Sequence, residues 1–347
     1  MTACIQKDSL PETEPFSHRL LRWWKVHGRH DLPWQHERTP YRVWVAEIML
    51  QQTQAGTVIP YFLRFIKQFP DLKTLARADQ DAVMSAWSGL GYYARARNLH
   101  KTARICAARH NGQLPQSPDE LVALPGIGRS TANAIAAQAF DTPVAILDGN
   151  VKRVLARHAG ITGWPGRSAV ERKLWAEAKR RMPATNAASY TQAIMDLGAG
   201  ICTRHRPQCR SCPVASDCFA LHNNQTRVLP APRPKRKRPL RALTLFLASN
   251  KNGEVLMQKR PSTGIWGGLW SLPEAGDLDP ELADGSSTPG MTMHHELTHL
   301  RLEITVKKIS FAPGRLVAES PSQRWMKPAR ALELGLPQPI RALLEDQ

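Results

Sequence analysis

Four cysteines fall within one short stretch of the chain, in the spacing C-x6-C-x2-C-x5-C: Cys202, Cys209, Cys212 and Cys218. Thiols this close together, in a chain with no secretory signature, indicate a metal site. A single zinc ion and an iron–sulfur cluster each accept four thiolates. The spacing favours the cluster, because zinc sites usually have two tight pairs and only Cys209 and Cys212 form one here. Four protein ligands leave no open position for a substrate, so we predict a structural site that orders its loop.

Two carboxylates have surroundings that suit acid–base chemistry. Glu47 lies in YRVWVAEIMLQQTQ (41–54), a segment of helical period whose glutamate has mostly apolar neighbours. A carboxyl group there loses hydration, and its pKa rises towards that of a general acid. Asp148 follows an apolar run that ends at Leu147, and we expect it to cap the next helix. An exposed glutamate and a plain N-cap are the local alternatives, and only the fold can bring the two carboxylates together.

Residues 117–140 (SPDELVALPGIGRSTANAIAAQAF) have the pattern of two helices joined by a tight turn. Ser117 and Glu120 predict a capping box at the start of the first helix, and Pro118 suits its first position. The second helix is predicted over residues 129–140. Glycines in the turn let a DNA phosphate approach the backbone, and the free amides of the second helix attract it. Such a helix-hairpin-helix contact sets register rather than sequence specificity, and an ordinary helical corner is the alternative.

Helical period dominates residues 16–227, after a loose polar tail at residues 1–15. Residues 228–241 (VLPAPRPKRKRPLR) are basic, proline-rich and free of acidic residues, so we predict a semi-extended linker, either solvated or lying along a DNA backbone. Residues 242–347 then change to strand period. The chain therefore divides into an all-helical domain and a smaller mixed α/β domain.

Three strands are predicted in the second domain. Residues 241–249 and 254–259 are joined by a turn at residues 250–253. Residues 298–307 alternate apolar and polar side chains, the pattern of a half-buried strand. Residues 295–299 (HELTH) match the zinc-protease motif H-E-x-x-H, which needs a helix to bring its histidines together. The segment has strand period instead, and four strand residues span roughly 13 Å, so we exclude a zinc protease.

The charge of the chain indicates its partner. The 347 residues carry a formal net charge of +18, with a pI of about 10.1. Release of counterions from phosphates rewards such a surface, so we favour nucleic acid as the partner over a merely solvated basic surface. We expect no membrane helix and no secretory signal, because the chain lacks the long apolar runs that both need. A monomeric, cytoplasmic protein, associated with the nucleoid when it is bound to DNA, is the expectation.

Together these segments resemble the iron–sulfur branch of the helix-hairpin-helix DNA glycosylases, and within it the MutY family of adenine DNA glycosylases. The resemblance runs from about residue 31 to the C-terminus. It implies an all-α helix-hairpin-helix glycosylase domain, a six-helix barrel plus an iron–sulfur cluster domain, followed by a smaller α/β Nudix-like domain. The matching motifs are DLPWQ (31–35), EIMLQQTQ (47–54), GLGYYARARNLHK (89–101), LPGIGRSTA (124–132), ILDGNVKRVLAR (146–157), MDLGA (195–199), the four cysteines and GIWGGLW (264–270).

The resemblance also implies a reaction. It predicts hydrolysis of the N-glycosidic bond of adenine mispaired with 8-oxoguanine or guanine in duplex DNA, with one structural 4Fe–4S cluster on the four cysteines. Glu47 would protonate the adenine, and Asp148 would stabilise the cationic sugar, as in two-carboxylate glycoside hydrolysis. Lyase-type relatives place a lysine just after the hairpin glycines, where this chain has Ser130, so base removal without strand cleavage is expected.

The target base must be flipped out of the duplex. By resemblance, Gln52 and Tyr92 would wedge into the base stack with Leu90 beside them, and Trp34 would line the base pocket. The full set of predicted DNA- and base-binding residues is Trp34, Gln51, Gln52, Thr53, Leu90, Tyr92, Gly126, Gly128, Ser130, Asn150, Thr298 and His299.

The C-terminal domain resembles the Nudix fold but lacks the glutamate-bearing helix that holds magnesium in Nudix hydrolases, so we expect no pyrophosphatase activity. In the family this domain recognises 8-oxoguanine with a Phe-Ser-His tip, which reads Leu297-Thr298-His299 here. Two alternatives remain open at this stage. One is a pyrimidine-lesion glycosylase with lyase activity, and the other is a zinc-bearing DNA-binding protein without enzymatic activity.

Overall fold

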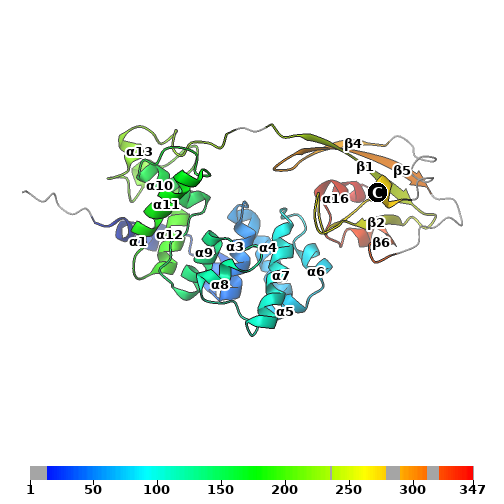
Figure 1. Cartoon of the computed structure of the whole chain (residues 1–347), viewed down its shortest axis with the longest axis horizontal. Helices are drawn as coiled ribbons and strands as arrows, with labels where there is room; N and C mark the ends of the chain where they lie inside the picture. The colour runs from blue at the N-terminus through cyan, green and yellow to red at the C-terminus, as the bar shows by residue number, and fades with distance from the viewer. Residues whose placement is uncertain (1–13, 235–236, 279–289, 311–319, 347) are drawn as a thin grey trace, which may run out of the picture. The chain divides into compact units, whose positions relative to one another are not determined.

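The computed structural model describes residues 14–234, 237–278, 290–310 and 320–346 (Figure 1). The predicted tail at residues 1–15 lies almost wholly outside the described residues. The chain forms two compact units, one of Met1–Glu47 with Leu114–Pro234 and one of Ile48–Gln113 with Lys235–Gln347. The helical region expected at residues 16–227 thus contributes to both units. Within the described residues, no helix is long and apolar enough to cross a membrane.

The first unit is helical, and its core is built from apolar positions spaced along helices that are far apart in sequence. Leu20, Leu155, Leu174 and Leu197 are among its fully buried side chains. A π-helical turn at Leu197–Ile201 and a 3-10 turn at Cys209–Ser211 lead into the cysteine loop. The helices are α1 (Phe16–His27), α2 (Pro33–His36), most of α3 (Pro40–Leu50), α8 (Pro118–Val122), α9 (Arg129–Phe140), α10 (Gly149–His158), α11 (Ser168–Arg181), α12 (Ala187–Asp196) and α13 (Phe219–His222).

The hairpin of α8 and α9 agrees with its predicted bounds but not with its predicted cap. Helix α8 begins at Pro118 and α9 covers residues 129–140, while Gly126 has the left-handed φ of 78° that a tight turn needs. The capping box at Ser117 and Glu120 is wrong, because the Ser117 side chain makes no capping hydrogen bond. The helix nevertheless starts at Pro118, with the N–H of Leu121 donating to the carbonyl of Ser117 at 3.0 Å.

The helical part of the second unit consists of the end of α3 and four further helices. Their amphipathic faces bury Phe62, Phe65, Trp87 and Met84 completely. Cys106 also lies in this core, and burial raises the pKa of its thiol to about 11. The helices are α4 (Ala55–Gln68), α5 (Leu72–Arg77), α6 (Gln80–Ala86) and α7 (Ala94–Arg109).

The rest of the second unit is a mixed sheet with short helices. Its strand order is β3-β2-β1-β5-β4, with β6 also paired to β2. The central pair β1–β5 is parallel and runs in register from Leu240↔Arg301 to Ser249↔Ser310, while the other pairs are antiparallel. The elements are β1 (Leu240–Ser249), β2 (Val255–Lys259), β3 (Trp270–Ser271), β4 (Thr292–Glu296), β5 (Arg301–Ser310), β6 (Gln323–Met326), α15 (Pro328–Ala331), α16 (Gln338–Glu345) and a 3-10 turn at Ala275–Asp277.

The strand predictions hold with one exception. Strands β1 and β2 and the turn between them lie where the sequence places them. The third strand begins only at Arg301, so the prediction for residues 298–300 is wrong. Those residues belong to the β4–β5 turn, which the hydrogen bond from Leu297 N to Leu300 O closes. The HELTH segment accordingly forms the end of β4 and this turn rather than a helix, which agrees with the exclusion of a zinc protease.

Candidate active site

The first unit brings Glu47 and Asp148 into one electrostatic environment. Glu47 projects from α3, and Nε2 of Gln138 on α9 donates a hydrogen bond of 2.7 Å to its Oε1. Burial raises the pKa of Glu47 to about 7; the charge of Asp148 adds to this rise and the Gln138 hydrogen bond opposes it. Near neutral pH the Glu47 carboxyl is therefore partly protonated, as a general acid should be.

Asp148 caps α10, as predicted. Its Oδ1 accepts the backbone N–H of Val151 at 2.7 Å. The pKa of Asp148 is raised overall, because burial outweighs the N–H groups of Val151 and Asn150 and the charge of Arg153, which lower it. The positive end of the helix thus favours a charged carboxylate at this position. The two carboxyl groups have distinct environments: Glu47 accepts the Gln138 amide, whereas Asp148 accepts a backbone N–H at the N-terminus of a helix.

Ser130 lies at the start of α9, and its hydroxyl forms a hydrogen bond with the backbone of the residue before Asp148. Its Oγ accepts the N–H of Leu147 at 3.0 Å. The hydroxyl therefore ties the helical hairpin to the segment that leads into α10. This position carries no amine, and its oxygen is already engaged with the backbone. An added Cβ on the hairpin's Gly128 would meet no atom within 4 Å, so the backbone there is open to a phosphate.

Asn150 and Arg153 connect the first turns of α10 to the cysteine loop. Nη2 of Arg153 donates to Oδ1 of Asn150 at 2.8 Å and to the carbonyl of Gly198 at 2.6 Å. Its Nε donates to the carbonyl of Cys202 at 2.7 Å. A Cβ on Gly198 would lie 2.6 Å from that of Asn150, so only glycine permits this approach. The helix that carries Asp148 is thus fixed directly to the first of the four cysteines.

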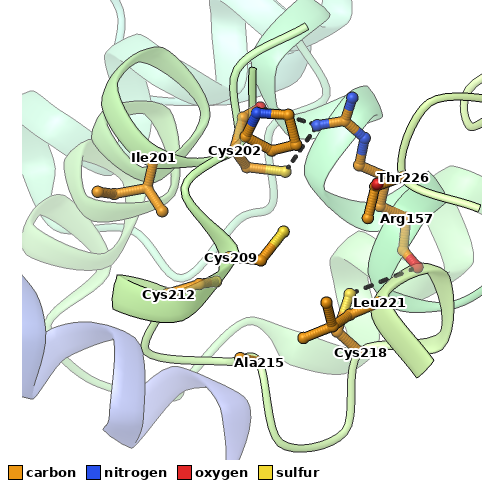
Figure 2. Close-up of a pocket in the computed structure, with 10 residues that line it drawn as sticks. Arg157, Ile201, Cys202, Cys209, Cys212, Ala215, Cys218, Leu221 and Thr226 are labelled. Carbon is orange, nitrogen blue, oxygen red and sulfur yellow. Dashed lines mark hydrogen bonds between the residues drawn. The ribbon is translucent and has the colours of Figure 1, made fainter. Parts of the chain in front are cut away.

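The four cysteines line one pocket with Arg157 (Figure 2). Figure 2 shows the sulfur atoms of Cys202, Cys209 and Cys218 facing the same space. In the described part of the chain, no group of three or more His, Cys, Asp or Glu side chains is arranged to hold a single metal ion. Four thiols around one pocket fit either a four-thiolate zinc ion or an iron–sulfur cluster.

The chemistry of these thiols also fits a cationic cofactor. Burial raises the pKa of Cys212 to about 12 and raises those of Cys209 and Cys218 as well. Thiols in such surroundings stay protonated unless a metal lies among them, because a bound metal ion deprotonates its ligands. Nη1 of the buried Arg157 donates to Sγ of Cys202 at 3.3 Å, which would stabilise a thiolate there.

Arg157 has a second role in shaping this loop. It donates to the carbonyls of Thr203 at 2.7 Å and Arg204 at 3.0 Å. Its Nε donates to the carbonyl of Leu229 at 2.9 Å, so the first residues of the predicted linker are held against α10. One buried guanidinium therefore closes the loop around the cysteines.

The predicted wedge residues belong to the second unit. Gln52 and Tyr92 have left-handed φ values of 59° and 48°, which are strained for residues with side chains and are typical of functional loops. The Tyr92 ring is 46% exposed, whereas Leu90 is buried. Oγ1 of Thr298, in the β4–β5 turn, donates to the Tyr92 hydroxyl at 3.4 Å. The loop after α3, the loop before α7 and the tip of the sheet thus meet in one unit.

Arg95 of α7 holds two of these loops, and it is a residue that sequence analysis missed. Its buried guanidinium donates 2.7 to 3.3 Å hydrogen bonds to five backbone carbonyls, and burial lowers its pKa to about 10. Nη2 also reaches Oγ1 of Thr53 at 3.3 Å. The bonded carbonyls are those of Ile48, Met49, Gln51, Leu90 and Gly91.

Comparison with known proteins identifies the family. Residues 45–180 match the model of the HhH-GPD superfamily base excision DNA repair proteins, and residues 244–346 match that of the NUDIX domain. The chain is 35% identical over 337 residues to the adenine DNA glycosylase of Buchnera aphidicola subsp. Baizongia pistaciae, and the alignment covers 95% of each chain. The chain belongs to the adenine DNA glycosylase family. This membership confirms the resemblance that the sequence motifs predicted.

Further relatives agree with this family and with the fold. The adenine DNA glycosylase of Homo sapiens is 33% identical over 315 residues, which cover 76% of this chain and 58% of the human protein. A solved structure of a thermostable thymine-DNA glycosylase matches 60% of this chain and 95% of its own, at 26% identity and a TM-score of 0.54. The structure of a non-covalent endonuclease III–DNA complex shares the fold of 60% of this chain, at 22% identity and a TM-score of 0.51.

The remaining predicted residues divide between the two units. Trp34 is buried in α2, and Gly126 forms the hairpin turn, both in the first unit. His299 lies exposed in the β4–β5 turn of the second. Sequence analysis also missed Gln138, which touches Glu47. A glutamine within the otherwise small and apolar run AIAAQAF was the available signal, because a buried amide needs a polar partner.

Replacing Arg95 tests its role in holding these loops. We expect Arg95→Met to lower the free energy of unfolding by about 3 kcal/mol or more, because several buried carbonyls lose their donor. Urea unfolding monitored by tryptophan fluorescence measures the loss. Arg104→Met removes an exposed arginine from the same helix and should stay within about 0.5 kcal/mol of the wild type. Equal losses for the two variants would contradict the role given to Arg95.

Proposed function

We propose that this protein hydrolyses the N-glycosidic bond of adenine in duplex DNA where the adenine is paired with 8-oxoguanine or guanine. The observation that carries the proposal is the pairing of Glu47, whose pKa is raised to about 7, with Asp148 at the positive end of α10. The names of the relatives indicate adenine as the base. The NUDIX match and the Thr298 tip beside Tyr92 support 8-oxoguanine as its partner.

The two carboxyl groups divide the chemistry. Glu47 donates its proton to the adenine, so that the base departs as a neutral molecule. Asp148 stays charged and stabilises the positive sugar that develops as the bond breaks. Water then attacks the sugar, its surplus proton passes to solvent, and the hydrolysis is complete. Because Ser130 offers no amine, no Schiff base forms and the DNA strand stays intact.

The basic chain and the hairpin position the DNA. The backbone amides at the start of α9 and the open surface at Gly128 suit a phosphate. Gln52 and Tyr92 enter the base stack when the adenine flips out, with the strain in their backbone held by Arg95. Cys202, Cys209, Cys212 and Cys218 would hold a 4Fe–4S cluster, which when bound supplies structural cross-linking of the loop next to α10.

A glycosylase assay on four duplexes tests the proposed reaction. The wild type should release adenine opposite 8-oxoguanine and guanine but not opposite cytosine or thymine, and strand breaks should form only after alkali. Glu47→Gln should slow release opposite 8-oxoguanine at least about 100-fold, because it removes the general acid. Release at the wild-type rate by Glu47→Gln would refute the mechanism, and no release from either mispair by the wild type would refute the function.

The single-turnover rate should depend on pH through Glu47. The reactive form carries the proton, so the rate should be high below pH 7 and fall as the pH rises through about 7. Rates measured from pH 5 to 9 under single-turnover conditions check this, with binding of the duplex measured at each pH as the control. A rate that rises with pH across this range would assign Glu47 the role of a base instead.

The cluster predicts a spectroscopic signature. Purified protein should be brown and absorb in the visible range, and iron analysis should give about four irons per chain. Cys209→Ser should lose most of this absorption, because it removes one of four ligands, whereas Cys106→Ser in the core of the second unit should keep it. Zinc in place of iron would favour the four-thiolate zinc alternative.

A further inference from the structure

A chain of side-chain amides extends from Glu47 into the first unit. Nε2 of Gln138 donates to Glu47 Oε1 at 2.7 Å, and Oε1 of Gln138 accepts from Nε2 of Gln35 at 3.5 Å. The second hydrogen of the same Gln35 amide goes to Oε1 of Gln192 at 2.6 Å. Nε2 of Gln192 donates to Oδ1 of Asp196 at 2.8 Å. Gln138, Gln192 and Asp196 are all buried.

Groups that can only donate or only accept hydrogen bonds fix both ends of this series of amides. Nη2 of Arg38, which can only donate, binds Oε1 of Gln35, so the NH2 group of Gln35 must face Gln138 and Gln192. At the other end, Asp196 can only accept while it is ionised. Its carboxylate takes Trp24 Nε1 at 2.9 Å and pairs with the Arg29 guanidinium at 2.7 Å.

The orientation of Gln138 follows from these ends. Because the Gln35 amide donates to Oε1 of Gln138, the Gln138 NH2 group is left for Glu47. A flipped Gln138 would set two NH2 groups against each other and turn an acceptor towards the carboxyl group. The orientation is therefore determined by Arg38 and Asp196, several side chains away from the reacting atoms.

We propose that Gln138 is a positioning residue that keeps the proton of Glu47 on Oε2. It occupies Oε1 with an N–H donor whose orientation is fixed by the other side-chain amides. The inference rests on the proposed function, in which Glu47 is the acid. A protonated Oε1 would face the Gln138 N–H donor to donor, so the acid carries its hydrogen on the other oxygen. The amides hold this arrangement without conducting protons, since a glutamine cannot pass on a proton and stay neutral. Reprotonation after each turnover must then come from solvent on the Oε2 side.

The same hydrogen bond adjusts the strength of the acid. Besides burial, two groups shift the pKa of Glu47: the Gln138 amide on α9 and the Asp148 carboxylate at the start of α10. Asp148 stabilises the protonated acid, whereas Gln138 stabilises the carboxylate that remains once the proton has left. Loss of Gln138 should make Glu47 a weaker acid that keeps its proton to higher pH.

Gln138→Met tests the proposal, because it preserves length and removes the donor. The titration of Glu47 is followed by ¹³C NMR of the cluster-containing protein labelled in its glutamate carboxyls, with the signal assigned by Glu47→Gln. The midpoint should move to higher pH in Gln138→Met. It should stay unchanged in Gln113→Met, which makes the same change at an exposed position. Coinciding midpoints for Gln138→Met and the wild type would overturn the proposal.

Kinetics provide a second readout that separates this proposal from the proposed function. With the duplex containing adenine opposite 8-oxoguanine, the high-pH fall of the single-turnover rate should move to higher pH in Gln138→Met. The low-pH plateau should drop roughly tenfold, as expected for a lost hydrogen bond to a charged group. A drop with an unmoved pH profile would mark Gln138 as merely structural and overturn the proposal. If the wild type releases no adenine, the proposed function fails, yet the NMR titration still decides the role of Gln138.

Gln138→Glu is a second variant that does not depend on how a thioether packs. It places a carboxyl against Glu47, and two adjacent carboxyls bind a shared proton tightly. The NMR midpoint should then move to higher pH than in Gln138→Met. A midpoint equal to that of the wild type would also overturn the proposal.

Discussion

The structure depends above all on keeping a carboxylate charged at the start of α10 while protein surrounds it. Desolvation raises the pKa of Asp148 overall, and the N–H groups of the first helical turn limit that rise. That opposition works only if the helix begins at this residue and cannot slide. Ser130 holds the N–H of the residue before, and Arg153 holds the first turns against the carbonyls of Gly198 and Cys202. The hairpin and the cysteine loop are thus two anchors of one helix terminus.

Glu47 needs the opposite property, because a general acid must keep its proton until the reaction. Helix α3 holds this carboxyl group in a desolvated position. The helix spans both compact units, since Glu47 is the last residue of a segment in one and Ile48 begins a segment of the other. Its last carbonyls need donors that a surface helix would take from water. Arg95 supplies them, and with the same guanidinium it binds the loop that carries Leu90 and Tyr92. The residues after Glu47 therefore leave the helix along a fixed path.

Most features that depend on local sequence were predictable, with two exceptions, whereas features that depend on distant partners were not. The bounds of α9 and the cap at Asp148 follow from glycine, proline and aspartate chemistry over a few residues. The capping box at Ser117 failed because a competent sequence does not oblige the side chain to turn inwards. The alternation of residues 298–300 lies before the true start of β5 at Arg301, because a turn can carry the same pattern as a strand.

The site shows the same division at longer range. The sequence motifs indicated Glu47 and Asp148 as site residues. No local sequence feature predicts that the helices α3 and α10 bring them into one electrostatic environment. Gln138 and Arg95 were missed for the same reason, although the polar Gln138 within an apolar run was a signal of a buried, paired amide. Each is a polar residue whose partners lie more than 40 positions away for its most important contact. Only the fold shows that these side chains are paired rather than exposed.

The choice of amides behind Glu47 has a physical reason. A site with two neighbouring carboxyls already carries more negative charge than protein easily holds, and a third ionisable group would couple its own titration to theirs. Glutamines fix a hydrogen-bond direction without adding charge, provided that something outside the chain decides which way each amide faces. Arg38 at one end of the amide series and the Asp196–Arg29 pair at the other end fix the orientation of the amides. The charges that orient the acid are thus kept away from it, and only a neutral donor touches the carboxyl that must give up its proton.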